Sequence, residues 1–466
     1  MPLVDLLPAA ATGQSYSSAL KIALEAHNLE NFINAMKLPV FLSEGQYYHR
    51  ANQSALIVAS EGGNTIDAGS GNHIIFGSFG DDHLRFSTGS NIVDLGEGLN
   101  TLNYDLFTVK NTINLATGIT TRASGDTDKI AGVDILVTGL GGDDVIGSAG
   151  ADIIYAANFG KNGLVENVWA GAGDDVIYTW HPNNQALSQG PVNVWGQDGN
   201  DTIYGNKTTN MLDGGAGDDK LFGHGGNDTH VGGSGNDIMD GGTNTLEGDF
   251  DTLDYRGDPN RIVADFRNTV WSPVLQRTVS TITDGWGDTD HVVDFERIMG
   301  SMFDDVIHGH QQGFSFPYGV KNRGVDLYGW GGNDTLTGGD GMDWIDGGAG
   351  ADILTGGAGT DRFRLSKASD GVGDVITDFT KGEDLIVLGK DPGSEWFWPC
   401  YYGVFPENRW VRNEGGLATQ ATTQLIQDTL TGNLYWDQDG TGAAARIQIA
   451  SFSTNLELTR FDIHVL

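Results

Sequence analysis

The chain has 466 residues, 70 of them glycine, and its 62 acidic side chains outnumber the 26 basic ones to give a formal net charge of −36. This balance argues against a nucleic-acid partner, because phosphate contacts need clustered lysine and arginine, and it favours divalent cations instead. A single cysteine excludes an intramolecular disulfide, and the lack of any run of about 18 apolar residues argues against a transmembrane helix.

Residues 1–55 precede the repeats. Their opening stretch, MPLVDLLPAAATG, has no basic region and does not resemble a cleavable signal peptide. We therefore expect a cytoplasmic protein, or export by a route that ignores the N-terminus. Apolar residues between Tyr16 and Met36 recur near the helical period and predict a small helix. The segment is interpreted either as a cap over the repeats or as an anchoring or assembly module.

A period of nine residues runs through most of the remaining chain. Residues 56–128 hold a degenerate array that begins ASEGGNTID at Ala59. Residues 129–249 hold the longest array, with blocks such as GGAGDDKLF and GGSGNDIMD in phase from Gly196. Residues 300–366 hold a further array, which includes GWGGNDTLT at Gly329. Between the last two arrays, residues 250–299 alternate in places and predict a β-rich insertion.

One block has a direct physical interpretation. Glycines at positions 1, 2 and 4 permit a tight turn, and an apolar residue at position 8 can point into a core. Stacked blocks then bury a continuous apolar ladder that no single block could bury alone. Stacking also brings the position-6 aspartates together with backbone carbonyls, and these oxygens are the ligands that Ca²⁺ prefers.

These blocks resemble the glycine–aspartate nonapeptide of the RTX (repeats-in-toxin) proteins, a calcium-binding β-helix repeat. The resemblance implies an all-β fold, a parallel β-roll or β-solenoid with a small N-terminal helical cap and a C-terminal β region, which holds multiple Ca²⁺ ions. The position-6 ligands that it implies are Asp143, Asp152, Asp175, Asp201, Asp219, Asp228, Asp237, Asp305, Asp334, Asp343, Asp352 and Asp361, with Asp82 and Asp134 as weaker candidates.

The degenerate array leaves two alternatives open. Its position-6 residues are asparagine or histidine in four of the five blocks, and Asp82 is the one acid at that position. It is either a further set of calcium turns or a metal-poor solenoid in which asparagines stack in ladders.

Residues 367–466 resemble the C-terminal region of serralysin-type exoproteins. The matching motifs are SDGVGDVITDFTKGEDLIVL and the D-x-D-G-x-G sequence at Asp437 and Asp439. The resemblance implies a calcium loop at these two residues and a type I secretion signal, and hence export from a Gram-negative bacterium. The aromatic stretch 394–410 is interpreted as a plug against the solenoid, a subunit contact or a sugar-stacking site.

No catalytic constellation stands out, since the chain has neither HExxH nor G-x-S-x-G, and we expect no enzyme. By architecture the chain resembles RTX proteins of bacterial surface layers. We therefore expect a secreted structural protein at the cell surface that folds on Ca²⁺ and assembles with itself as a surface layer, filament or matrix. Its other expected partners are the type I secretion machinery and cell-surface polysaccharide. The alternatives are a module that acts on or binds acidic polysaccharide (epimerase, lyase or lectin-like) and an adhesin.

Overall fold

The structure is a computed structural model that describes residues 40–465, apart from 44, 50–52, 60, 157–163, 181–189, 243–249, 311–322, 366–372, 389–402 and 454–455. The predicted helix between Tyr16 and Met36 and most of the 394–410 stretch lie outside the described residues. The chain divides into two compact units, Met1–Thr208 and Thr209–Leu466. The described residues are all-β, with two short 3₁₀ turns, η5 (Glu407–Arg409) and η6 (Arg460–Asp462), and no α-helix. Within this part of the chain, no helix is long and apolar enough to cross a membrane.

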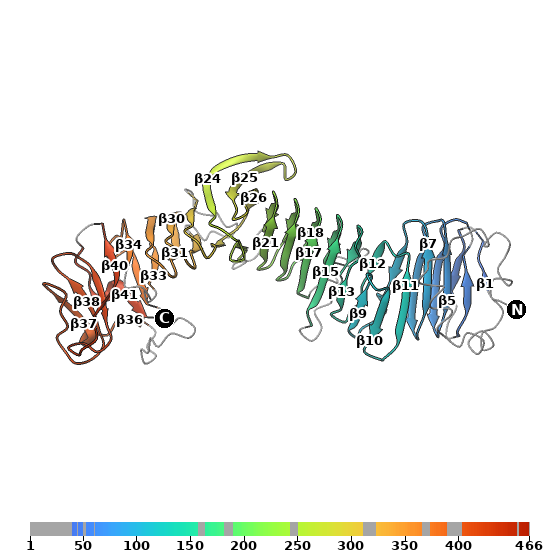
Figure 1. Cartoon of the computed structure of the whole chain (residues 1–466), viewed down its shortest axis with the longest axis horizontal. Coiled ribbons are helices and arrows are strands. Elements are labelled where there is room, and N and C mark those ends of the chain that lie inside the picture. Colours follow the sequence, from blue (N-terminus) through green and yellow to red (C-terminus); the bar gives the residue numbers. More distant parts are fainter. Residues whose placement is uncertain are drawn as a thin grey trace. The chain divides into compact units, whose positions relative to one another are not determined.

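In unit 1, successive coils stack their strands into two mainly parallel sheets (Figure 1). The strands of the first sheet are β1 (Val40–Phe41), β3 (Leu56–Val58), β5 (Ile74–Ser78), β7 (Ile92–Gly96), β9 (Asn111–Asn114), β10 (Ile119–Arg122), β11 (Thr127–Ala131), β13 (Asp144–Ile146), β15 (Glu166–Ala172) and β17 (Val192–Asp198). The strands of the second are β2 (Tyr47–His49), β4 (Thr65–Ser70), β6 (His83–Thr88), β8 (Thr101–Asn103), β12 (Ile135–Val137), β14 (Ile153–Tyr155), β16 (Val176–Tyr178) and β18 (Thr202–Tyr204). Among these described strands, only β10 is antiparallel to its neighbours, β9 and β11.

Unit 2 has the same two-sheet plan. Its first sheet contains β19 (Met211–Ala216), β21 (Thr229–Ser234), β23 (Thr252–Asp254), β27 (Arg297–Met299), β29 (Arg323–Tyr328), β31 (Met342–Asp346), β33 (Arg362–Leu365), β35 (Leu385–Leu388), β36 (Gly403–Val404) and β41 (Ile463–Val465). Its second contains β20 (Lys220–Phe222), β22 (Ile238–Asp240), β24 (Val263–Ser272), β25 (Arg277–Thr283), β26 (Thr289–Val293), β28 (Val306–His308), β30 (Thr335–Asp340), β32 (Ile353–Ala358), β34 (Asp374–Ile376), β37 (Trp410–Asn413), β38 (Gln424–Asp428), β39 (Leu434–Asp437) and β40 (Ile447–Phe452).

The core lies between the two sheets of each unit and follows the nine-residue period. Neighbouring strands of one sheet are one coil apart, so Leu336 on β30 pairs with Leu354 on β32 across 18 residues. Both of these position-8 side chains are fully buried, as are Ile154 and Ile203 in unit 1. The parallel β-roll expected from the repeats is therefore confirmed.

The β-rich insertion predicted at 250–299 forms part of unit 2. Strands β24 and β25 make a long antiparallel hairpin, and β25 pairs with β26. Figure 1 shows the hairpin projecting from the stacked coils around it. Because β24 also pairs in parallel with β28 and β26 with β22, the excursion leaves the second sheet and then rejoins it.

Candidate calcium-binding turns

The position-6 aspartates lie in ladders along the turns. In each ladder one carboxylate oxygen accepts a hydrogen bond from the backbone N–H of the equivalent residue one coil earlier. Asp237 Oδ1 accepts from Asp219 N at 2.8 Å, and Asp352 Oδ1 accepts from Asp334 N at 2.9 Å, each across 18 residues. These side chains are almost completely buried, so the strand register brings carboxylates into stacks that solvent does not reach.

The ladders also include acidic residues that the nine-residue pattern did not predict as ligands. Asp228 N donates to Asp251 Oδ1, Asp251 N donates to Glu296 Oε2, and Asp237 N donates to Asp290 Oδ1. In each case an acid stands two residues before a buried apolar residue, as Asp290 does before Val292. That spacing is the signal that could have found them, but the glycine pattern around them is broken.

Backbone dihedral angles sort the turns into two classes. In what we call open turns, positions 2 and 4 both have positive φ, as at Gly233 (102°) and Gly235 (128°) before Asp237. Among the turns that the structure describes, three open turns hold a non-glycine residue at position 2, namely Gln197, His224 and Trp330. In the described residues, the open turns with aspartate at position 6 are those of Asp175, Asp201, Asp219, Asp228, Asp237, Asp334, Asp343, Asp352 and Asp361.

In the other class, which we call capped turns, the position-2 N–H closes onto the aspartate of its own turn. Ser148 N donates to Asp152 Oδ2 at 2.6 Å and Ser301 N donates to Asp305 Oδ2 at 2.6 Å. Among the described turns, the remaining capped ones are those of Asp82, Asp143 and Asp384, with donors Ser78, Gly139 and Thr380. A hydrogen therefore points at the oxygen that a cation would need.

Open turns leave that oxygen without such a donor. The Oδ2 atoms of Asp175, Asp237, Asp334 and Asp343 are buried and make no hydrogen bond. Glycine at position 1 has no side chain, and this leaves room for the Oδ2 atom. A Cβ at Gly338, for example, would collide with Asp343 Oδ2 and lie 2.6 Å from the carbonyl oxygen of Gly356. Carboxylate and carbonyl oxygens thus converge beside position 1 of an open turn, which is energetically unfavourable unless a cation or a proton stands between them.

The electrostatics of the open turns support the same conclusion. Burial, with neighbouring aspartates adding to it, raises the pKa of Asp237 to about 7 and that of Asp334 to about 8. It raises the pKa of Asp175 and of Asp343 to about 7 in the same way. At neutral pH these carboxyl groups resist ionisation in the absence of a compensating positive charge.

The donor set suits Ca²⁺. Among the described residues, no three His, Cys, Asp or Glu side chains come together as a metal-binding group. An open turn such as that of Asp343 instead offers one carboxylate beside the backbone carbonyl of Gly356, and Ca²⁺ accepts such mixed oxygen ligands. The ion would supply positive charge between the coils, while the open-turn aspartates and carbonyls would hold it.

Three predicted ligands lie apart from both classes. Asp134 accepts from Asn100 N through Oδ2 at 2.8 Å and belongs to a ladder, although its block is not an open turn. Asp437 and Asp439 lie at the end of β39 and just after it, and Oδ1 of each is buried without a hydrogen bond. The ligand roles of all these aspartates, in open and capped turns alike, stay predictions.

Comparison with known proteins agrees with this geometry. The family model for RTX calcium-binding nonapeptide repeats (four copies) matches residues 58–93, 130–159, 164–180, 195–229, 204–239, 231–245 and 327–363. These segments are RTX calcium-binding repeats, and several such repeats along the chain support the binding of multiple Ca²⁺ ions. Such repeats are typical of secreted proteins of Gram-negative bacteria.

The solved structures that match include the extracellular lipase LipA from Serratia marcescens, at 16% identity and a TM-score of 0.19. The match covers 64% of this chain and 45% of the lipase chain, so the chain spans less than half of the length of that lipase. No curated protein matches.

Proposed function

We propose that the protein is a secreted structural protein that folds when it binds calcium and then assembles with itself outside the cell. The observation that carries the proposal is the set of buried open-turn aspartates, such as Asp237 and Asp334, whose Oδ2 atoms have no hydrogen-bond donor. Uncompensated charges at these depths oppose folding, so ion binding becomes folding free energy. Calcium at about 10⁻⁴–10⁻³ M, the range of extracellular modules, would supply the switch.

Support for self-assembly comes from the β24–β25 hairpin. Its tip exposes Val270, Trp271 and Val274, with 42%, 63% and 48% of their surface accessible. An apolar group of this kind on a projecting element favours contact with another protein surface, and aromatic residues are enriched in the cores of such contacts. A second copy of the chain is the partner that a surface layer, filament or matrix requires.

Light scattering and negative-stain microscopy of the purified protein during a calcium titration test this proposal. We expect ordered sheets or filaments near millimolar calcium that dissolve in chelator. The Trp271→Ser variant should fold with the same calcium dependence but assemble at a higher protein concentration. Folding to a monomer that never assembles would contradict the structural role and favour a module that binds or acts on acidic polysaccharide.

A further inference from the structure

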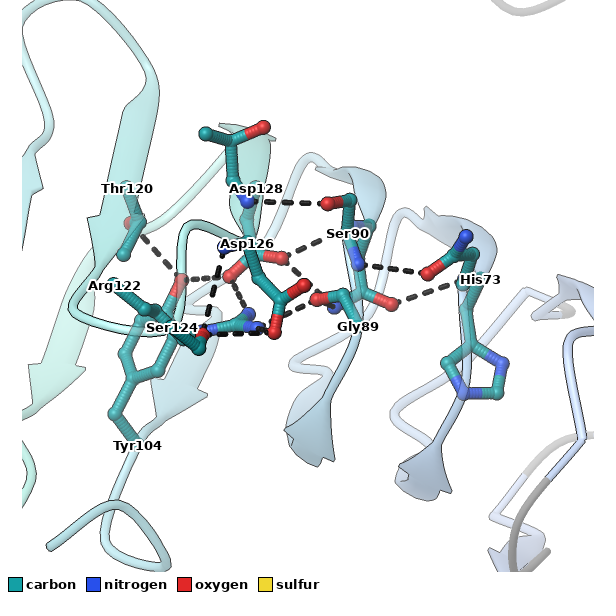
Figure 2. Close-up of polar contacts among 12 residues, drawn as sticks. His73, Gly89, Ser90, Tyr104, Thr120, Arg122, Ser124, Asp126 and Asp128 are labelled. Carbon is teal, nitrogen blue, oxygen red and sulfur yellow. Dashed lines mark hydrogen bonds and ion pairs between the residues drawn. The ribbon is translucent and has the colours of Figure 1, made fainter. Parts of the chain in front are cut away.

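Arg122 lies buried among the turns of the first repeats. The N-terminal array, defined as the described residues of 56–131, includes a ladder that runs from His73 through Asn91 to Asp128. Figure 2 shows the Arg122 side chain reaching this ladder beside Gly89 and Asp128. Only 1% of the Arg122 side chain is accessible to solvent, and its partner Asp128 is fully buried.

The Arg122 guanidinium contacts the same kinds of oxygen that an open turn would offer to calcium. Nη2 pairs with the Asp128 carboxylate, and Nη1 donates to the carbonyl oxygen of Gly89, the position-4 glycine of its block, at 2.5 Å. The guanidinium also lies 4.6 Å from the centre of the Phe107 ring. A protein-borne cation thus stands between a ladder carboxylate and a turn carbonyl.

Both carboxylate oxygens of Asp128 already accept hydrogen bonds from protein donors. Oδ1 accepts from both the backbone N–H of Asn91 (3.0 Å) and its side-chain amide (2.8 Å). Oδ2 pairs with Arg122 and lies 3.1 Å from the Tyr104 hydroxyl, which in turn bonds to Thr120. Four donors satisfy the roughly four lone-pair sites of a carboxylate. A calcium ion would have to displace them.

In neighbouring turns, side-chain amides of asparagine donate to the turn carbonyl oxygens that a cation would otherwise contact. The Asn64 side-chain amide donates to the carbonyl of Gly62 at 2.6 Å, and that of Asn91 donates to Gly89 at 3.2 Å. With aspartate at these positions, two oxygens would face each other instead. The remaining repeat aspartate of this array, Asp82, belongs to a capped turn.

We propose that the Arg122 guanidinium is a built-in cation that takes the place of calcium in the N-terminal array, so that this part of the chain folds with no bound calcium. The RTX repeat family matches residues 58–93, yet the array is built to be metal-free. It would then give the calcium-dependent coils a preformed surface on which to stack. The inference rests on the proposed calcium-driven folding, and its test separates the two.

Hydrogen–deuterium exchange of the full chain, with millimolar calcium or with chelator, tests this directly. In chelator, peptides around Asp237 and Asp334 should lose more than about tenfold in amide protection, while those of 56–131 keep theirs. Loss of protection across 56–131 as well would overturn the inference and leave calcium-driven folding intact. No calcium effect at Asp237 or Asp334 would instead contradict the proposed function.

Variants at the buried pair sharpen the test. Arg122→Met should remove the protection of 56–131 in chelator, because it leaves Asp128 buried without its positive partner. The double variant Arg122→Met, Asp128→Asn should regain it, which a purely steric role for Arg122 would not produce. The control is Arg85→Met, which removes a 40% exposed arginine that pairs with Asp105 and should change little. Unchanged protection in Arg122→Met would also overturn the inference.

Discussion

At the residue scale, the turns depend on glycine for two separate reasons. Gly235 has a φ of 128°, which L-residues other than glycine rarely adopt. It also lies against the preceding coil, since a Cβ there would collide with the carbonyl oxygen of Gly217. By contrast, a Cβ at Gly225, in the neighbouring turn, would meet no other heavy atom within 4 Å.

This difference gives a matched pair of substitutions. Gly235→Ala should lower the free energy of unfolding of the calcium-bound protein by about 2 kcal/mol or more, from left-handed backbone strain and backbone overlap. Gly225→Ala should change it by less than about 0.5 kcal/mol, because the added methyl group meets no neighbouring atom. Denaturant unfolding in millimolar calcium measures both, and equal effects would contradict the close stacking of the turns.

A second pair of substitutions separates the two turn classes. Asp334→Asn removes a carboxylate whose Oδ2 has no donor, and Asp152→Asn removes one capped by Ser148. The first should raise the calcium concentration needed for half-maximal folding several-fold, because one ion loses its charged ligand. The second removes no open-turn ligand, so it should shift that midpoint less, by only as much as the loss of the capping hydrogen bond destabilises the fold. Circular dichroism during a calcium titration decides between them, and equal midpoint shifts would show that capping does not exclude calcium.

At the scale of the element, the nine-residue period predicts much of what the turns and strands do. The position-8 residues Leu336 and Leu354 are buried as their spacing requires. His230 also stands at position 8 and is fully buried, where burial lowers its pKa to about 3 and keeps the ring neutral. The strand register follows from the same period, because one coil is two blocks.

The class of a turn could not be predicted in the same way. Serine at position 2 goes with capping at Ser78, Ser148 and Ser301, yet Gly139 caps its turn as well. Trp330 adopts positive φ although it is not glycine. The φ value at position 2 depends on how the neighbouring coils stack, and residue type alone does not encode it.

The role of Arg122 was also beyond prediction from spacing. It belongs to β10, in a segment without the nine-residue period. Its guanidinium donates a hydrogen bond to the carbonyl oxygen of Gly89, 33 residues earlier in the chain. The antiparallel pairings of β10 with β9 and β11 place this strand beside the ladder. Asp251 and Asp290 were missed because their blocks keep the acid and the apolar residue but lack glycine at positions 2 and 4.

At the scale of the whole molecule, the raised carboxyl pKa values predict an unusual pH dependence in chelator. The folded-state pKa values of Asp175, Asp237, Asp334 and Asp343 are raised to about 7 to 8, above the ordinary value near 3.9. Their contribution to stability is therefore present below about pH 4 and is lost as pH rises through 7 to 8.

Without calcium, the protein should consequently unfold at a higher temperature at pH 5 than at pH 8. With calcium the order should reverse, because ion binding requires ionised carboxylates and protons compete with it. Thermal unfolding followed by circular dichroism at the two pH values, in chelator and in calcium, measures this. A chelated protein that is more stable at pH 8 would show that these aspartates are not buried together.

The most direct measurement is a calcium titration of the full chain, starting from chelator at pH 7.5 and followed by far-ultraviolet circular dichroism. We predict a cooperative gain of β-sheet signal at about 10⁻⁴–10⁻³ M calcium. Chelator should reverse this gain, and magnesium should not reproduce it. The same β-sheet spectrum in chelator as in calcium would contradict the central claim that the open-turn aspartates make folding depend on the ion.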